Sequence, residues 1–179
     1  MQTIEGTQLL RDDHKLIVGL FRQLEAVEAR APEMRKGVTR TLVMELEIHM
    51  RIEEEIFYPA LQETGDVVAN ELIARSRNEH AEAKQLLTAL KSANWHNDIR
   101  IWRNTLLRLI QSVQLHIREE EHESLPLAER LLKDRLMEIG MWLKTRKAEL
   151  QAEPQYRSAQ PEVTQDFHGG EQMRKKAAG

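Results

Sequence analysis

Two stretches of the chain share one pattern of polar residues: HMRIEEEIFYPAL (49–61) and HIREEEHESLPLAERLL (116–132). Each begins with a histidine, carries a glutamate four residues later, and reaches a proline ten residues after the histidine. Residues four apart in an α-helix lie on the same face, so each stretch can present a nitrogen and an oxygen side by side. One such pair is weak evidence in a chain rich in acidic residues, so the repetition carries the argument.

The repetition extends upstream of both stretches. His14 precedes His49 by 35 residues, and His80 precedes His116 by 36. Aligning His14 with His80 also places Asp12-Asp13 opposite Asn78-Glu79. An internal repeat of this length indicates a repeated structural unit. The chain therefore reads as two helical hairpins, each with one histidine on its first helix and a His-x-x-x-Glu pair on its second.

Composition supports an all-α protein and excludes several chemistries. The chain has 179 residues, of which 41% are hydrophobic and only 4% aromatic, with 8 glycines and 5 prolines. The absence of cysteine excludes disulfides, thiolate nucleophiles, iron–sulfur clusters and cysteine-ligated zinc. A balance of 26 basic and 29 acidic residues gives no reason to expect nucleic acid as a partner.

No apolar run approaches the roughly 18 residues needed to span a membrane, and residues 1–14 do not resemble an export signal. A cytoplasmic protein is therefore expected.

Hydrophobic periodicity predicts five helices. The first begins near Thr3 or Thr7 and ends near residue 30, and Ala31-Pro32 marks the boundary to the second. The others are expected at 33–62, from a cap at Asp66 to about 91, at 98–124 and, as a shorter helix, up to about 150. Prolines 59 and 126 are expected to kink or end the second and fourth helices.

These elements predict an up-and-down antiparallel four-helix bundle with a short fifth helix, forming one domain over residues 1–150. From Gln151 onward the apolar periodicity stops, and residues 151–179 read as a polar, disordered tail.

Helical phase directs four histidines into the core of this bundle, because each lies in the apolar stripe of its helix, and two glutamates project beside them. Burying two unpaired carboxylates would cost several kcal/mol each, whereas a metal ion would satisfy them. The predicted metal ligands are His14, His49, Glu53, His80, His116 and Glu120. Imidazole and carboxylate suit iron, manganese, zinc or copper, and two carboxylates can bridge a pair of ions.

With NEHAEAKQLL (78–87) in third place, the ordered motif H…HxxxE…H…HxxxE resembles the hemerythrin-like (HHE cation-binding) family over about residues 7–145. The resemblance implies two non-haem iron ions in an oxo- or hydroxo-bridged centre, with the four histidines as terminal ligands and Glu53 and Glu120 as bridges. By the two-hairpin arrangement, His14 and His49 would serve one iron, and His80 and His116 the other.

Oxygen-carrying hemerythrins have a further histidine where this chain has Lys84, which favours an open site and chemistry with nitric oxide or peroxide. Lys84 could pair with a carboxylate such as Glu53, Glu120 or Glu121, and Glu79 or Glu82 could replace the missing ligand.

The function that follows is a di-iron protein that binds O2 or a related small molecule, nitric oxide or peroxide, for sensing, storage or stress response. Three alternatives remain open: a di-iron peroxidase, catalase-like enzyme or oxidase; an iron donor in stress repair; and a metal-free polar network. Zinc or manganese occupancy, the oligomeric state and protein partners also remain open.

The remaining notable residues are interpreted as packing or surface groups. Glu54 and Glu121 are expected to accept hydrogen bonds from the ligating histidines, and Phe57 to line the apolar wall. Tyr58, nine residues after His49, falls on the opposite side of an ideal helix and is interpreted as packing at the helix end. Trp102 and Trp142 are expected in the core, and His96, His122 and His168 on the surface.

Overall fold

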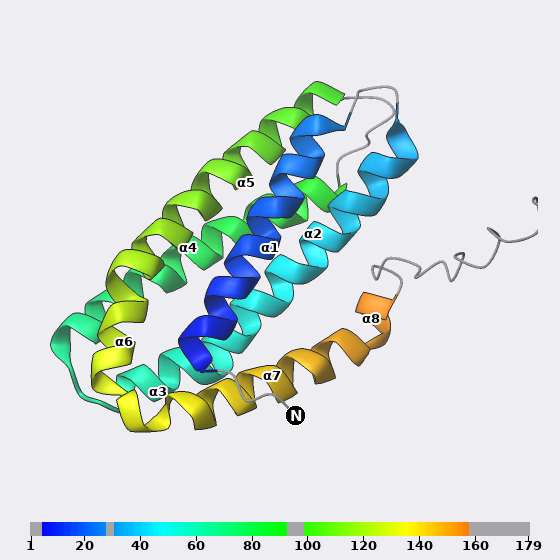
Figure 1. Cartoon of the computed structure of the whole chain (residues 1–179). Coiled ribbons are helices and arrows are strands. Elements are labelled where there is room, and N and C mark those ends of the chain that lie inside the picture. The colour runs from blue at the N-terminus through cyan, green and yellow to red at the C-terminus, as the bar shows by residue number, and fades with distance from the viewer. Residues whose placement is uncertain (1–4, 28–30, 93–98, 158–179) are drawn as a thin grey trace, which may run out of the picture.

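A computed structural model describes residues 5–27, 31–92 and 99–157. Four long helical rods form a bundle within this part of the chain, as predicted (Figure 1). The first rod is α1 (Gly6–Ala26), and the third is α4 (Val67–Ser92). The second joins α2 (Pro32–Ile52), the π-helical segment η1 (Glu53–Phe57) and α3 (Tyr58–Gln62). The fourth joins α5 (Ile99–Glu119), the π-helical segment η2 (Glu120–Ser124) and α6 (Leu125–Leu131).

Local sequence signals set the boundaries of these rods. Pro32 stands in the first turn of α2, where its missing N–H costs nothing. Gly65 adopts a left-handed conformation with φ of 70° between α3 and α4, a region that glycine enters without strain. The Asp66 carboxylate then accepts a hydrogen bond from the Ala69 N–H at 2.9 Å, which confirms the predicted cap of α4.

Pro59 and Pro126 do not end their helices, because both rods continue beyond them, but the regular α-helix is interrupted just before each proline. The Tyr58 N–H bonds to the Glu53 carbonyl oxygen, and the Leu125 N–H to that of Glu120, which are the five-residue steps of a π-helix. Each proline is thus in the first turn of the α-helix that follows a widened turn. The wider turn accommodates a ring that would crowd a regular α-helix.

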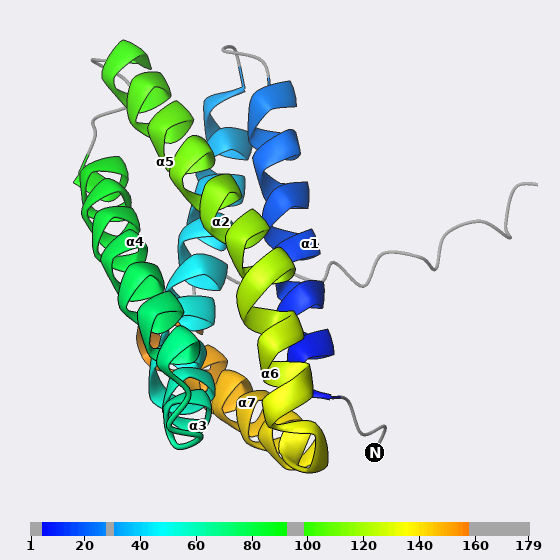
Figure 2. The same cartoon turned by 90° about the vertical axis from the view of Figure 1, so that its left-hand side faces the viewer.

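The fifth helix, α7 (Leu136–Ala152), follows a short 3₁₀ turn, η3 (Lys133–Arg135), and crosses one end of the bundle against α1 and α2 (Figures 1 and 2). The approach is close at Gly6, where an added Cβ would lie 3.0 Å from Ile139 Cγ2. A side chain at residue 6 would therefore require Ile139 to shift.

The helical part of the chain also extends past the predicted start of the tail at Gln151. Helix α7 runs to Ala152, and α8 (Pro154–Arg157) follows it. Tyr156 in α8 is buried against the core, which gives this end of the chain an apolar anchor that periodicity alone did not reveal. The rest of the predicted tail lies outside the described residues.

The two tryptophans differ in their surroundings. Trp102 is buried, as predicted. Trp142 is 39% exposed, so its assignment to the core was wrong. Helix α7 buries its face through Ile139 and Leu143, which turns Trp142 toward solvent, where the Arg135 guanidinium lies 6.0 Å from its ring centroid.

The apolar core is divided into two clusters. One lies near α7 and includes Leu10, Ile52 and Leu125, and the other lies toward the opposite end and includes Ile17, Leu46 and Val113. Between them runs a layer of buried histidines and carboxylates. Among the described helices, none combines the length and the apolar character needed to cross a lipid bilayer.

Candidate metal centre

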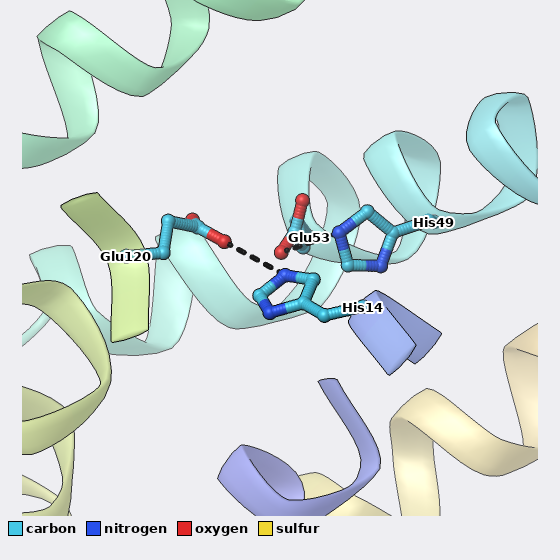
Figure 3. A group of neighbouring side chains, drawn as sticks. All are labelled: His14, His49, Glu53 and Glu120. Atoms are coloured by element: carbon cyan, nitrogen blue, oxygen red, sulfur yellow. Dashed lines mark ion pairs between the residues drawn. The ribbon is translucent and has the colours of Figure 1, made fainter. Parts of the chain in front are cut away.

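The structure brings the six predicted side chains into this one polar layer, and each is at least 95% buried. Two groups have ligand atoms that all lie within 4.8 Å of one another. The first is His14, His49, Glu53 and Glu120, and the second is Glu53, His80 and His116. Figure 3 shows the first group, whose side chains point toward one another from three of the four rods.

Each glutamate faces one histidine of each hairpin. Glu53 Oε1 lies 3.3 Å from His49 Nε2, and its Oε2 lies 3.3 Å from His80 Nε2. Glu120 Oε2 lies 3.4 Å from His14 Nε2 and 3.5 Å from His116 Nε2. Both carboxylates therefore span the gap between the His14/His49 pair and the His80/His116 pair, which is the placement that a bridging ligand requires.

The histidine rings form two edge-to-face pairs. The ring centroids of His14 and His49 are 4.9 Å apart, and those of His80 and His116 are 4.7 Å apart. These are the pairs that the hairpin arrangement led us to expect at the two irons.

A carboxylate stands beside the outer nitrogen, Nδ1, of every one of these histidines. The Nδ1 to carboxylate-oxygen distances are 3.1 Å for His14–Glu121, 3.7 Å for His49–Asp13, 2.9 Å for His80–Glu54 and 2.8 Å for His116–Glu79. Such a carboxylate keeps the proton on Nδ1 and leaves Nε2 free to bind a metal.

Two of these outer carboxylates were expected from the sequence. Glu54 and Glu121 lie within hydrogen-bond distance of His80 Nδ1 and His14 Nδ1, as predicted. Glu79 contacts His116 instead of replacing a ligand, and Glu82 is exposed on the surface of α4. Asp13 and Glu79 were missed as histidine partners, although the internal repeat had already aligned them with each other.

Burial shapes the protonation of the cluster. It lowers the pKa of His49 to about 4, so this imidazole is neutral at neutral pH, which is the form that binds metals. Burial and the nearby Glu120 raise the pKa of Glu53 well above its ordinary value. Although burial opposes ionisation, His116 and His14 hold the pKa of Glu120 well below its usual range.

The atoms that face the middle of the layer fit a metal pair. Among the described residues, His14 Nε2, His49 Nε2, both Glu53 oxygens and Glu120 Oε2 have no hydrogen-bond partner. Buried polar atoms without partners are costly, and here they converge on one space. A cation bound there would satisfy all of them, and nitrogen and carboxylate donors suit iron, manganese or zinc.

A model of the hemerythrin HHE cation-binding domain matches residues 5–128 of the chain. The chain belongs to this family. Three uncharacterized proteins, Rv2633c and MT2709 from Mycobacterium tuberculosis and Mb2666c from Mycobacterium bovis, are each 23% identical to it over 150 residues. The aligned part covers 83% of this chain and 88% of each relative.

The crystal structure of an HHE cation-binding domain-containing protein from Mycobacterium kansasii, an Rv2633c homolog, has the same fold. It superposes with a TM-score of 0.72 at 24% sequence identity, covering 87% of this chain and 96% of that one. The similarity extends beyond the residues matched by the HHE model, which ends in α6.

Tyr58 belongs to the polar layer of this HHE domain, so its interpretation as helix-end packing was wrong. Its hydroxyl donates a hydrogen bond to Glu120 Oε1 at 2.9 Å and lies 3.3 Å from His80 Nε2. The π-helical segment explains the difference, because its extra residue places Tyr58 one turn after Glu53 and not on the opposite face. Burial and Glu120 raise the pKa of Tyr58 well above its ordinary value, so the phenol is neutral.

In the second half of this HHE domain, the internal repeat places Leu125 where the first half has Tyr58. Leu125 is fully buried. At this position the first half of the site carries a phenol hydroxyl, and the second half carries an aliphatic side chain.

Lys84 lies at the edge of the layer and not in its middle. Its Nζ contacts both oxygens of Glu54, at 2.6 and 2.7 Å, and none of the three carboxylates suggested from the sequence. Glu54 thus bonds to His80 on one side and to Lys84 on the other, and the hydrogen bonds from these two residues lower its pKa to about 2.

The other histidines take no part in the layer as described. His122 is exposed, as predicted, and its Nδ1 lies 2.7 Å from the Arg118 carbonyl oxygen. His96 and His168 lie outside the described residues.

Proposed function

We propose that this HHE protein holds two non-haem iron ions between His14, His49, His80 and His116, with Glu53 and Glu120 as bridges. Its function would be to bind O2 or a related small molecule, nitric oxide or peroxide, for sensing, storage or stress response. The observation that carries the proposal is the position of the two glutamates, each of which faces one histidine from each hairpin. The shared layer of unpartnered donors supports a pair of ions over a single one.

When bound, the irons would supply one-electron redox chemistry and open coordination positions. The chain would supply the surroundings. The outer carboxylates orient the four imidazoles, and the two inner carboxylates offset the charge of the metals. Ile52, Phe57 and Val113 are buried next to the layer and would exclude bulk water from it.

The test is metal analysis combined with absorption spectroscopy of the aerobically purified protein. We expect about two irons per chain, as in carboxylate-bridged di-iron bundles, and a near-ultraviolet charge-transfer band. Reduction should bleach the band, and addition of O2 or nitric oxide to the reduced protein should produce a new spectrum. A chain that holds zinc or no metal, or a spectrum that strong chelation leaves unchanged, would contradict the proposal.

Tyr58 favours peroxide turnover as a second candidate function. The Tyr58 phenol is neutral and buried beside Glu120 and His80, and its single O–H can turn from Glu120 to donate a hydrogen bond or a proton to a small molecule at the centre. A catalase-like reaction converts two molecules of hydrogen peroxide into two of water and one of O2, so it needs no external reductant.

Replacing Tyr58 with phenylalanine should therefore lower peroxide turnover while the iron content stays the same. The expected decrease is about a hundredfold, the lower range for removal of a positioned proton donor. The measurement is O2 release from hydrogen peroxide at equal iron content. The control is Tyr156→Phe in α8, which removes the other tyrosine hydroxyl and should leave turnover unchanged. Equal turnover in the Tyr58→Phe variant would reject this role.

A further inference from the structure

Helix α7 is connected to the polar layer by a partly buried lysine, Lys147. Lys147 Nζ lies 2.5 Å from Asp13 Oδ1 and 3.3 Å from Glu45 Oε2. Both carboxylates are buried, and the lysine side chain is only 17% exposed. Figure 1 shows the arrangement that permits this contact, with α7 crossing α1, which carries Asp13, and α2, which carries Glu45. An ion pair shielded from water in this way is screened far less than one on the surface.

The second oxygen of Asp13 faces the polar layer. Asp13 Oδ2 lies 3.7 Å from His49 Nδ1, and neither atom has a hydrogen-bond partner among the described residues. The other three histidines hold their carboxylates at 2.8 to 3.1 Å. Asp13 is therefore divided between Lys147 on one oxygen and His49 on the other, with the lysine in the closer contact.

The contact of Asp13 with Lys147 affects how strongly the His49 imidazole can donate electrons to a metal. A carboxylate at Nδ1 orients the imidazole and raises its basicity. A cation in contact with that carboxylate partly neutralises its charge, so the basicity of the imidazole rises less. The other half of the layer also has a lysine, Lys84 on Glu54, but its side chain is 46% exposed and His80 still lies 2.9 Å from Glu54. Water screens Lys84 much more than it screens Lys147.

We propose that Lys147 is a positioning residue for the metal centre: it holds Asp13 and limits the charge that Asp13 presents to His49, which makes the His14/His49 half less electron-rich than the His80/His116 half. The inference rests on the proposed function as a metal centre. It also gives α7, which follows the residues matched by the HHE model, a part in that centre.

Two substitutions with opposite expected effects test this role. Lys147→Met removes the cation and leaves Asp13 with its full charge beside His49, which favours the oxidised metal. Asp13→Asn removes the negative charge and favours the reduced metal. The affinity of the site for ferric iron, relative to its affinity for ferrous iron, should rise about tenfold in Lys147→Met and fall about tenfold in Asp13→Asn. Tenfold is the lower range for changes around a ligating histidine. Spectroelectrochemical titration of the iron-loaded protein measures this ratio.

The matched controls are Lys147→Arg and Lys84→Met. The arginine keeps the charge and should retain the wild-type ratio. A purely structural role for Lys147 would make Lys147→Met and Asp13→Asn shift the ratio in the same direction or leave it unchanged, and either result overturns the proposal. If Lys147→Met does not fold, Lys147→Gln keeps a hydrogen bond to Asp13 without the charge and should give the same rise.

A second readout does not depend on iron. In the zinc-loaded protein, the imidazole nitrogen-15 signals of His49 should shift in Lys147→Met and stay in place in Lys84→Met. An unchanged His49 signal in Lys147→Met overturns the role of Lys147. If the wild-type chain binds zinc but no iron, the proposed function fails and the His49 signal still decides the question of Lys147.

Discussion

Replacing Glu53 with glutamine is expected to remove both metal ions from the protein. Glu53 belongs to both groups of ligand atoms, with one oxygen 3.3 Å from His49 Nε2 and the other 3.3 Å from His80 Nε2. Glutamine has nearly the same shape but carries no charge, and its amide nitrogen cannot bind a metal. The change therefore removes one of the two bridging carboxylates. Glu120 alone would then offset the charge of the two cations.

The measurement is the iron-to-protein ratio after reconstitution with ferrous iron and removal of loosely bound metal. We expect the affinity for iron to fall at least tenfold and the ratio to fall with it, because changes that only touch the partners of metal ligands already cost 10–100-fold in affinity. Glu55→Gln is the matched control two residues away, where the glutamate pairs with Arg51 and Arg146 on the outside of the bundle. A Glu53→Gln protein with the iron content of the wild type would rule out Glu53 as a ligand.

Removal of the metal is expected to lower the thermal stability of the protein. Buried nitrogens and oxygens of His14, His49, Glu53 and Glu120 lack hydrogen-bond partners among the described residues, so their burial is costly unless a cation pairs with them. A ligand that binds only the folded state stabilises it by about 2.7 kcal/mol at a hundred times its Kd. For a chain of this size, that free energy corresponds to a rise in Tm of roughly 5–10 °C.

Calorimetry of the metal-free and iron-loaded proteins measures this difference. The Glu53→Gln variant provides the comparison, because its Tm should not respond to added iron. Identical unfolding temperatures for the two forms of the wild-type protein would show that the layer is stable as a metal-free network.

The bundle and the meeting of six side chains could be predicted because both follow from regular helical geometry. His14 and His49 lie in the apolar stripes of their helices, and the repeat gave His80 and His116 the same setting in the second hairpin. Three- and four-residue spacing was sufficient to place all four in the interior. The loop lengths then placed most of them at one depth.

The position of Tyr58 and the continuation of two helices past their prolines were not predicted, because the helices depart from regular α-helical geometry there. The π-helical segments change the helical phase after Glu53 and Glu120, so a wheel of 3.6 residues per turn placed Tyr58 on the wrong face. The same segments explain why Pro59 and Pro126 do not end their helices.

The contact of Lys147 with Asp13 escaped for another reason. The two residues are 134 positions apart, and no local pattern marks either of them as a partner of the other. Only the docking of α7 on α1 brings them together.

The division of ligands between the hairpins has a consequence for biosynthesis. Neither hairpin contains a complete group, because the His14/His49 group needs Glu120 and the His80/His116 group needs Glu53. During translation, no full set exists until the ribosome has released the chain beyond residue 120 and the late hairpin has docked on the early one. In the proposed di-iron protein, binding of both ions therefore requires both hairpins, and a nascent chain stalled before residue 120 lacks Glu120 of the His14/His49 group.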